Sequence, residues 1–448
     1  MKPQFLIAAP HSGAGKTTVT LGILRALRNR GLAVQPFKCG PDYLDPKLHA
    51  IAAGKPGINL DRFMMDDVHL KDLYAGYGCA SEVLVTEGVM GLFDGSVKME
   101  GSSADLARLL QIPVIMVINA KAMAYSAAAL LLGFKMLCKD IRIAGVIFNF
   151  VSHESHYKLL KEAAEDVGIV SLGYLPAHPE IQIPSRHLGL KTGLEIEADA
   201  IIENAAHHLN KYIDLDELLR ITTIPLIETG GLLKKPVQIN NLPLKKIAIA
   251  HDEAFNFTYA ENLAALATLG EIIYFSPLQD SVLPDADLIY LPGGYPELHL
   301  ETLSANQTMR DQLYAYYQRG GKIIAECGGM MYLGRSISDE NGIEYPMAGI
   351  LDSRTGMQHK KLSIGYKKIN IGGTVIMGHE FHYSQFIDQP AVNTLTIENQ
   401  DPSAVVQIWN ARNELLDLPV FYTPNLLASY FHFYFGNNLQ AIEKLLFS

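Results

Sequence analysis

The sequence has few cysteines, no excess of basic residues and no long hydrophobic run, and each absence excludes a class of protein. Its four cysteines include no CxxC pair, which argues against a zinc site or a disulfide framework. Lys and Arg number 37 against 47 for Asp and Glu, so nucleic-acid binding is not the expected task. The longest uncharged apolar stretch, residues 122–134, is too short to span a bilayer. Met1–Pro10 lacks the apolar core of a signal peptide, so we expect a cytoplasmic location.

The composition that remains is typical of a folded protein with more than one domain. Hydrophobic residues make up 48% and charged residues 19% of the 448 residues. Gly (37) and Pro (22) are close to average usage, which excludes a disordered, collagenous or low-complexity chain. One hydrophobic core rarely grows beyond about 250–300 residues, so we expect at least two domains.

Short apolar segments alternate with helical segments through the first half of the chain. The expected strands are residues 5–9, 33–37, 82–86, 113–119, 143–148 and 170–175. Helical segments at residues 19–30 and 122–138 separate some of them. Apolar strands joined by helices are typical of a parallel sheet covered on both faces.

The alternation breaks at residues 221–244, where Pro, Gly and paired Asn and Lys residues indicate a linker. It restarts with a helix at residues 258–269 and strands at residues 247–250, 272–275, 288–291 and 323–325. The sequence therefore predicts an α/β domain at residues 1–220, a linker at 221–244 and a second α/β domain at 245–448.

A glycine-rich loop connects the first strand to the first helix. Glycines let backbone N–H groups surround phosphate oxygens, and the helix N-terminus adds positive potential. In this arrangement the lysine reaches the β- and γ-phosphates, and the following threonine hydroxyl binds Mg²⁺. Pro10 replaces the first glycine of the strict motif, but the rest of the pattern is present. We expect an ATP site that contains Gly13, Gly15, Lys16, Thr17 and Thr18.

Acidic residues follow the second and third strands, at the sheet edge where open α/β sheets bind ligands. Asp42 and Asp45 lie in residues 38–46, which we expect to form a rigid loop, and Glu87 and Asp94 lie in residues 87–95. Carboxylates with phosphates are common Mg²⁺ ligands, although Asp is also frequent in turns and caps. Asn149 ends another strand, where its amide either reads adenine or starts a loop.

A cysteine lies at a strand–turn–helix junction in the second half. Residues 322–326 form an expected strand that enters Cys327-Gly328-Gly329, a pattern typical of a nucleophile elbow. The helix N-terminus would lower the pKa of the thiol, and the N–H of Gly328 would face an oxyanion. Residues 292–297 would supply a second donor, at Gly294. The candidate general base is His432, with His379 and His382 as competitors, and a buried, inert cysteine is the alternative.

Residues 39–46, 87–95 and 291–297 and the Cys327 elbow, in this order, resemble the glutamine-hydrolysing corrinoid a,c-diamide synthase family. The resemblance implies a dethiobiotin-synthetase-like P-loop domain followed by a class I glutamine amidotransferase domain with a flavodoxin-like α/β fold. It also implies a ligase of cobalamin biosynthesis. Such a ligase would amidate the a and c carboxylates of cobyrinate, using ATP and ammonia released from glutamine.

The resemblance also implies roles for individual residues. ATP and Mg²⁺ would bind at Lys16, Thr17, Asp45 and Glu87, and the activated carboxylate would lie near Asp42, Tyr43, Leu44 and Asp94. Cys327 matches the nucleophile and His432 its base. Ordinary class I glutaminases carry His-x-Glu, whereas Phe433 and Tyr434 follow His432 here, so the third acid is missing from its usual place. Family members resemble this chain in that respect, so we still expect an active glutaminase.

The chemistry expected from this resemblance has two parts. The γ-phosphoryl group of ATP converts a carboxylate into an acyl phosphate, which ammonia can attack. Cys327 releases that ammonia from glutamine through a thioester. The expected partners are ATP, L-glutamine and a corrinoid polycarboxylate, with no nucleic acid and no membrane, and a homodimer is a candidate assembly.

Three alternatives stay open at this point. The chain could be a cobyric acid synthase, which amidates other side chains. It could be an a,c-diamide synthase acting on hydrogenobyrinate or nickel-sirohydrochlorin. A non-enzymatic ATP-dependent switch with a relict second domain is the alternative of another class, and the intact elbow argues against it.

Overall fold

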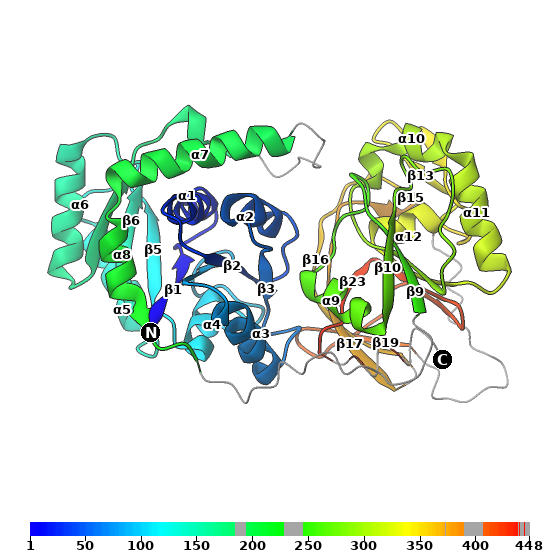
Figure 1. The fold of residues 1–448 in the computed structure, drawn as a ribbon, viewed down its shortest axis with the longest axis horizontal. Coiled ribbons are helices and arrows are strands. Elements are labelled where there is room, and N and C mark those ends of the chain that lie inside the picture. Colours follow the sequence, from blue (N-terminus) through cyan, green and yellow to red (C-terminus); the bar gives the residue numbers. More distant parts are fainter. Residues whose placement is uncertain are drawn as a thin grey trace. The chain divides into compact units, whose positions relative to one another are not determined.

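The computed structural model describes residues 1–183, 194–227, 245–371, 373–388, 406–437, 439 and 443. The chain forms two compact units, Met1–Lys234 and Lys235–Ser448, and Figure 1 shows the elements of each. The predicted linker spans the division between the units. Its residues 221–227 include the end of one helix and a short strand, and its remainder lies outside the described residues.

The first unit contains a parallel sheet in the strand order β3-β2-β4-β1-β5-β6-β7, with a short strand β8 antiparallel to β1. The strands are β1 (Lys2–Ala8), β2 (Val34–Cys39), β3 (Ile58–Leu60), β4 (Val83–Glu87), β5 (Val114–Asn119), β6 (Ile143–Asn149), β7 (Val170–Leu175) and β8 (Thr223–Ile224). All six strands predicted in this unit are confirmed, with ends shifted by a few residues. Because these strands are parallel, the loops that follow β1, β2 and β4 open at one edge of the sheet.

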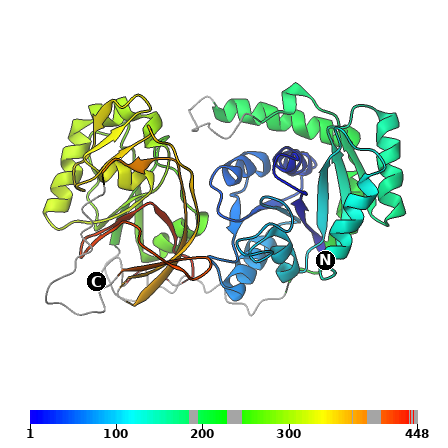
Figure 2. The same cartoon turned by 180° about the vertical axis from the view of Figure 1, so that it is seen from behind.

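Helices cover both faces of this sheet. They are α1 (Lys16–Asn29), α2 (Asp45–Ala53), α3 (Asp67–Cys79), α4 (Ser103–Leu110), α5 (Ala127–Leu137), α6 (Glu154–Asp166), α7 (Leu194–Tyr212) and α8 (Leu215–Thr222), with a 3₁₀ turn η1 (Pro179–Ile181). Residues of α1, α2, α7 and α8 share one buried cluster with the strands. Figure 2 shows α1 and α2 on one side of the sheet and α3 and α4 on the other. Coverage on both faces explains why the strands are almost wholly apolar.

One local prediction in this unit was wrong. Residues 38–46 were expected to form a loop throughout, but Lys38 and Cys39 end β2, and Asp45 begins α2. Pro46 lies in the first turn of α2, where a missing N–H costs nothing because that group has no partner within the helix. The two ends of this segment are therefore held in regular structure, and only residues 40–44 form the turn.

The second unit is built around another sheet, in the order β10-β9-β11-β12-β22-β21. Its strands are β9 (Lys245–Ala250), β10 (Gly270–Phe275), β11 (Leu288–Leu291), β12 (Lys322–Glu326), β21 (Val420–Thr423) and β22 (Leu426–Ser429). All neighbours are parallel except β21 and β22. The four strands predicted here, and the helix at residues 258–269, are confirmed by β9–β12 and α9 (Ala260–Leu269).

Two further sheets in this unit were not predicted. An antiparallel sheet contains β16 (Ser363–Ile371), β17 (Thr374–His382), β19 (Gln407–Asn410), β20 (Leu415–Leu416) and β23 (Phe431–Tyr434). A smaller, mixed sheet contains β13 (Ser336–Ser338), β14 (Glu344–Pro346), β15 (Arg354–Gly356) and β18 (Gln385–Phe386). The antiparallel sheet packs on the central sheet in a shared apolar cluster. It brings residue 432 on β23 into register with residue 379 on β17.

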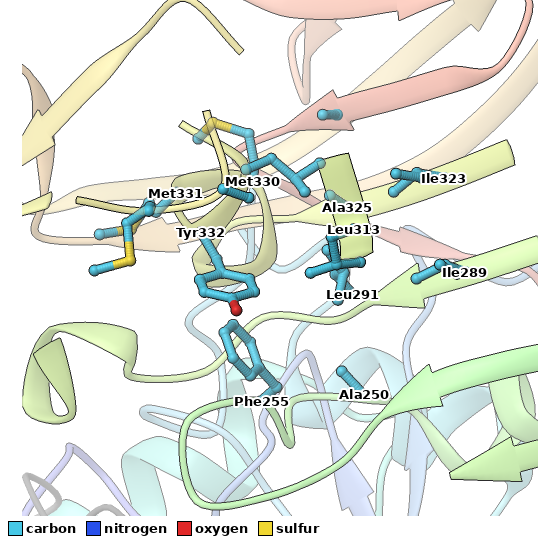
Figure 3. Packing of buried hydrophobic residues seen from close by; sticks show 14 of the residues in the cluster. Ala250, Phe255, Ile289, Leu291, Leu313, Ile323, Ala325, Met330, Met331 and Tyr332 are labelled. Atoms are coloured by element: carbon cyan, nitrogen blue, oxygen red, sulfur yellow. The ribbon is translucent and has the colours of Figure 1, made fainter. Parts of the chain in front are cut away.

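A second apolar cluster packs α10 (Leu300–Ala305), α11 (Gln307–Gln318) and α12 (Gly328–Leu333) against the central sheet. Figure 3 shows part of this cluster, with Tyr332 of α12 beside Phe255 at a ring-centroid distance of 5.3 Å. Cys327 lies directly before α12, so this packing fixes the position of the elbow. Among the helices that the structure describes, none has the length and apolar character needed to cross a bilayer.

Candidate active sites

The loop between β1 and α1 adopts the conformation that a phosphate loop requires. Gly13 (φ 80°) and Gly15 (φ 95°) both lie in the left-handed region that glycine tolerates best. Space is also limiting, because a Cβ atom on Gly15 would lie 2.0 Å from Nδ2 of Asn149. Conformation and close approach together explain why the sequence has glycine at residue 15.

Asn149 fastens this loop to the end of β6. Its Nδ2 donates a hydrogen bond to the carbonyl oxygen of Ala14 at 3.0 Å, and its Oδ1 accepts one from the N–H of Phe150 at 3.0 Å. The side chain is buried. The structure therefore gives Asn149 a contact with the phosphate loop, and the adenine contact expected from the sequence stays a prediction.

A cavity of about 470 Å³ opens beside the phosphate loop. Cavities of this size are typical of small-molecule sites. It brings together many of the predicted site residues: Gly13, Gly15, Lys16, Thr17, Thr18, Asp42, Leu44 and Asp45. The described residues that line the cavity do not include four other predicted site residues, Tyr43, Glu87, Asp94 and Asn149. Part of the wall comes from α7, at Glu197, Ala198, Ile201 and Ile202, which the sequence analysis did not identify.

Charged side chains form a buried network behind the phosphate loop. The Thr17 hydroxyl donates to Oε1 of Glu87 at 2.7 Å, and Nε2 of His49 lies 2.6 Å from Oε2 of the same carboxylate. Nζ of Lys38 lies 2.7 Å from Oδ2 of Asp45 and 3.4 Å from Oε1 of Glu87. Lys38, Asp45, His49 and Glu87 are each at most 2% exposed. Sequence reasoning missed Lys38 and His49, although a lysine in an apolar strand is an unusual residue to bury.

The network favours the charged forms of Lys38 and Glu87 despite their burial. Burial alone lowers the pKa of Lys38, but the charges of Asp45 and Glu87 outweigh it and the net shift is upward. Burial raises the pKa of Glu87, but Lys38 and His49 oppose this and the net shift is downward. The Thr17 hydroxyl and the carboxylates of Asp45 and Glu87 thus bring oxygen atoms together next to the phosphate loop. Such a donor set fits Mg²⁺, which prefers hard oxygen ligands.

The remaining predicted residues of this unit have defined local contacts. Nζ of Lys16 donates to the carbonyl oxygen of Met90 at 2.6 Å. Oδ1 of Asp42 accepts from the N–H groups of Leu44 and Asp45, so Asp42 also holds the turn before α2. The exposed Asp94 accepts from the N–H of Gly91 at 2.9 Å. Asp42 therefore combines a turn contact with a place at the cavity, whereas the described contact of Asp94 is a turn contact.

Cys327 has the strained backbone expected of a nucleophile elbow. Its φ of 45° and ψ of −106° are unfavourable for any residue other than glycine. Its N–H donates to the carbonyl oxygen of Ser429 at 2.7 Å. A Cβ atom on Gly329 would lie 2.2 Å from the carbonyl oxygen of Leu291, so glycine is required by the close packing of this turn. Strain of this kind is concentrated at functional sites.

The pKa of Cys327 shifts in the direction opposite to the one expected from the sequence. Burial raises it, and the charge of Glu297 raises it further. The N–H of Gly328 lowers it, as expected of a helix N-terminus, but has the smaller effect. The thiol therefore keeps its proton until a base removes it.

The two predicted oxyanion donors lie next to each other. A Cβ atom on Gly328 would lie 3.1 Å from the backbone nitrogen of Gly294 and 2.7 Å from Cδ of Pro296. His432 packs against the same segment, because a Cβ atom on Gly293 would lie 2.2 Å from its Cε1. The fold thus collects the elbow, residues 293–294 and His432 from three separate parts of the sequence.

The three candidate histidines have different surroundings. Nδ1 of His379 lies 2.9 Å from the Tyr259 hydroxyl, and its ring stacks on that of His432 with centroids 4.9 Å apart. Both ring nitrogens of His382 have polar contacts at 2.8 Å, one with the carbonyl oxygen of Ser384 and one with Glu380. His432 is the one of the three that contacts residues 293–294 in the described contacts, which favours it as the base.

A buried carboxylate also lies beside His432. Oε2 of Glu326, the last residue of β12, is 3.7 Å from Nδ1 of His432. Oε1 of the same side chain accepts a hydrogen bond from the N–H of Phe433 at 3.1 Å. Sequence reasoning missed Glu326 because it looked for an acid two residues after the histidine.

Comparison with known proteins gives matches over both units. Residues 5–190 match the model of the CobQ/CobB/MinD/ParA nucleotide binding domain, and residues 246–440 match that of the CobB/CobQ-like glutamine amidotransferase domain. These matches confirm the predicted fold class, an α/β P-loop domain followed by an α/β glutamine amidotransferase domain.

Full-length relatives are also found. A protein of Listeria innocua named cobyrinate a,c-diamide synthase is 39% identical over 99% of this chain and 98% of its own length. One of the same name from Salmonella typhimurium is 38% identical over 99% of this chain and 97% of its own. A hydrogenobyrinate a,c-diamide synthase of Brucella anthropi is 41% identical over 87% of this chain and 91% of its own. The similarity therefore extends through both units.

Proposed function

The chain belongs to the family of cobyrinate a,c-diamide synthases, and on this premise we propose that it converts the a and c carboxylates of cobyrinate into carboxamides. It is then a carbon–nitrogen ligase that consumes ATP and takes its nitrogen from glutamine. The observation that supports the proposal is that one chain contains the residues expected for both sites. The first unit places a phosphate loop and acidic residues at one cavity, and the second unit brings a strained cysteine turn and a buried histidine to the same segment, residues 293–294.

The first unit activates the carboxylate. Backbone N–H groups of the phosphate loop bind the phosphates of ATP, and Lys16 neutralises charge that develops as the γ-phosphoryl group moves. The products are ADP and an acyl phosphate of the corrinoid. Asp42 and Leu44, which line the cavity, are proposed to position the reacting carboxylate. Tyr43 and Asp94 stay predictions for the same task.

Mg²⁺ is part of the proposal because the donor set fits it. Thr17, Asp45 and Glu87 would hold the ion, and Lys38 and His49 position the two carboxylates. When bound, Mg²⁺ supplies charge neutralisation at the β- and γ-phosphate oxygens. Lys38 lies 2.7 Å from Asp45 and 3.4 Å from Glu87, so part of the negative charge of this donor set is already compensated by the protein.

The second unit generates ammonia. His432 takes the thiol proton of Cys327 as the sulfur attacks the carboxamide carbon of glutamine. The N–H groups of Gly294 and Gly328 stabilise the oxyanion of the tetrahedral intermediate. Return of the proton to nitrogen releases ammonia and leaves a glutamyl thioester, which water hydrolyses to glutamate. Ammonia then attacks the carbonyl carbon of the acyl phosphate and displaces phosphate.

The proposal includes a cytoplasmic location, because the reaction consumes ATP. A homodimer stays a prediction that sedimentation of the purified chain would test. Neither point is needed for the chemistry above.

Turnover with three substrates tests the function. Purified chain, ATP and glutamine are incubated with cobyrinate, hydrogenobyrinate or nickel-sirohydrochlorin, and the product masses are measured. The proposal predicts two successive amidations of cobyrinate, which place amides on the a and c side chains. Preference for hydrogenobyrinate, the substrate in the name of the Brucella relative, would change the proposed macrocycle but not the proposed reaction. Amidation of other side chains would indicate a cobyric acid synthase, and no turnover with any of the three would favour the switch protein.

A further inference from the structure

The second unit contains a buried acid that no sequence pattern assigned to the glutaminase site. Glu326 and His432 are each 1% exposed, and the carboxylate faces the ring at 3.7 Å between Oε2 and Nδ1. The acid of ordinary class I glutaminases follows the histidine by two residues, and this chain has Tyr434 there. Glu326 instead comes from β12, the strand that leads directly into Cys327.

The position of Glu326 is fixed by a hydrogen bond at one oxygen, and the other oxygen faces His432. Oε1 accepts a hydrogen bond from the N–H of Phe433, the residue after His432. This bond ties the acid to β23 and leaves Oε2 directed toward Nδ1 of His432. A separation of 3.7 Å is longer than a hydrogen bond, but catalytic hydrogen bonds are often long before substrate binds and shorten in the complex.

The surroundings of the pair favour this role. Burial raises the pKa of Glu326 on balance, and the hydrogen bond and charge of His432 oppose that shift, so the neighbouring imidazole favours the ionised carboxylate against the effect of burial. Besides Glu326, the described titratable groups near His432 include His379, which stacks on its ring, and Tyr259, which hydrogen-bonds to His379. Tyr290 on β11 approaches the Glu326 carboxyl. Among these described neighbours, Glu326 is the one that carries a carboxyl group.

The competing pair in the same unit does not fit the same role. Glu380 accepts from His382 but also pairs with Lys367 at 3.0 Å, so its charge is already compensated. The second nitrogen of His382 contacts the carbonyl oxygen of Ser384 at 2.8 Å. Both nitrogens of that ring are therefore used in local contacts, and neither is left to receive a thiol proton.

We propose that Glu326 is the positioning residue that takes the place of the missing third acid. In this proposal, which rests on the glutaminase function proposed above, Oε2 holds Nδ1–H of His432 and thereby directs Nε2 toward Cys327. When Nε2 accepts the thiol proton, the carboxylate stabilises the imidazolium that results. The proton then passes to the departing ammonia, and Glu326 itself exchanges none.

Glu326→Gln tests the proposal. The amide keeps the shape and can still accept from Phe433, but it removes the charge. We expect the kcat for glutamine hydrolysis to fall by about 100-fold. The acid limb of its kcat/KM profile should move to lower pH, because a neighbouring carboxylate favours the charged form of an imidazole and the amide does not. Amidation with added ammonia, which uses the first unit, is the internal reference and should keep its wild-type rate.

The control is Glu271→Gln, which removes an exposed carboxylate from β10 at the edge of the same sheet. It should change neither the rate nor the pH profile. A Glu326→Gln protein with wild-type kcat, or one with a lower kcat but an unmoved acid limb, would overturn the proposal. In the second case Glu326 would be only structural.

A second variant covers the case in which the amide does not fold. Glu326→Asp keeps the charge but withdraws it by one methylene, so we expect a smaller loss of kcat and a smaller shift of the acid limb. An unchanged rate and profile in the aspartate variant would overturn the proposal. If the unmodified chain shows ammonia-dependent amidation but no glutamine hydrolysis, the glutaminase function fails first and Glu326 with it.

Discussion

The two units differ in how their surroundings shift the pKa values of buried groups. In the first unit, Lys38 lies between the carboxylates of Asp45 and Glu87, and its positive charge helps to hold the pKa of Glu87 below its usual value despite burial. In the second unit, burial raises the pKa of Glu297 to about 7, and burial together with the charge of Glu297 keeps the Cys327 thiol protonated. The first site thus holds buried charged groups beside the phosphate loop, whereas in the second the thiol of the proposed nucleophile stays neutral until a base removes its proton.

The comparison indicates that the two partial reactions, phosphoryl transfer and glutamine hydrolysis, need different electrostatic surroundings, and that each unit provides one of them. Phosphoryl transfer needs fixed charges before the reaction begins. Glutamine hydrolysis needs a nucleophile that does not react with other electrophiles before glutamine binds. Variants that affect one unit should therefore leave the partial reaction of the other intact, and each prediction below uses that separation.

The largest effect is expected for Lys16→Ala in the first unit. Loss of the ammonium removes charge stabilisation from the transferring phosphoryl group, so amidation should fall by about 100- to 1,000-fold. The loss should be equal with glutamine and with ammonia, because both need the acyl phosphate. Amide formation measured by product mass with each nitrogen source checks this. A loss confined to glutamine would contradict the assignment of ATP chemistry to the first unit.

Gly293→Ala is the matching change in the second unit. The new Cβ would lie 2.2 Å from Cε1 of His432, so the ring must move. A displacement of about 1 Å can cost 100-fold in rate, and glutamine hydrolysis should fall by about 10- to 100-fold. Amidation with ammonia should be retained. Glutamate release at wild-type rate would show that His432 is not the base.

Lys38→Met should damage stability as well as activity. It leaves Asp45 and Glu87 buried without their cation, which typically costs about 3–5 kcal/mol. The pKa of Glu87 is lowered in the folded wild type, so its contribution is present above an unfolded pKa of about 4.3 and is lost as pH falls through the folded pKa. The variant should therefore be least stable relative to wild type near neutral pH.

Urea unfolding of wild type and the Lys38→Met variant at neutral and at acidic pH measures this difference. The gap in unfolding free energy should narrow as pH falls, because protonated carboxyls no longer need the cation. An equal gap at both pH values would mean that lost packing, and not charge, explains the destabilisation.

The smallest effect is expected for Asn149→Ala. The change removes the hydrogen bond to the carbonyl oxygen of Ala14, worth about 1 kcal/mol. If Asn149 only holds the phosphate loop, the KM for ATP should rise roughly fivefold, and the KM for GTP, if GTP is used, should rise by the same factor. A loss specific to ATP would support the adenine contact expected from the sequence.

The fold of the first unit could be predicted from sequence more fully than that of the second. Its strands are buried on both faces, so each is a continuous apolar run that is easy to recognise. In the second unit, β16 and β17 alternate exposed and buried residues and contain glycines, and Ile364 of β16 is exposed. These two strands pair with each other, but β16 also pairs with β19 and β17 with β23, which lie far along the sequence and which local patterns do not reveal.

The candidate sites show the same limit. The phosphate loop and the Cys327 elbow are local conformations, and glycine spacing was enough to predict them. Lys38 and Glu326 were missed because each matters through a partner that is distant in sequence, Glu87 for the lysine and His432 for the acid. A buried charged residue inside an apolar strand is the one signal that could have identified both.

Cys327→Ser, assayed with glutamine and with ammonia, tests the division of labour most directly. The substitution removes the nucleophile and should leave the cavity of the first unit unchanged. We predict that glutamine hydrolysis and glutamine-dependent amidation are lost, while amidation of cobyrinate with ATP and ammonia continues at the wild-type rate. Full glutamine-dependent amidation by this variant would contradict the account.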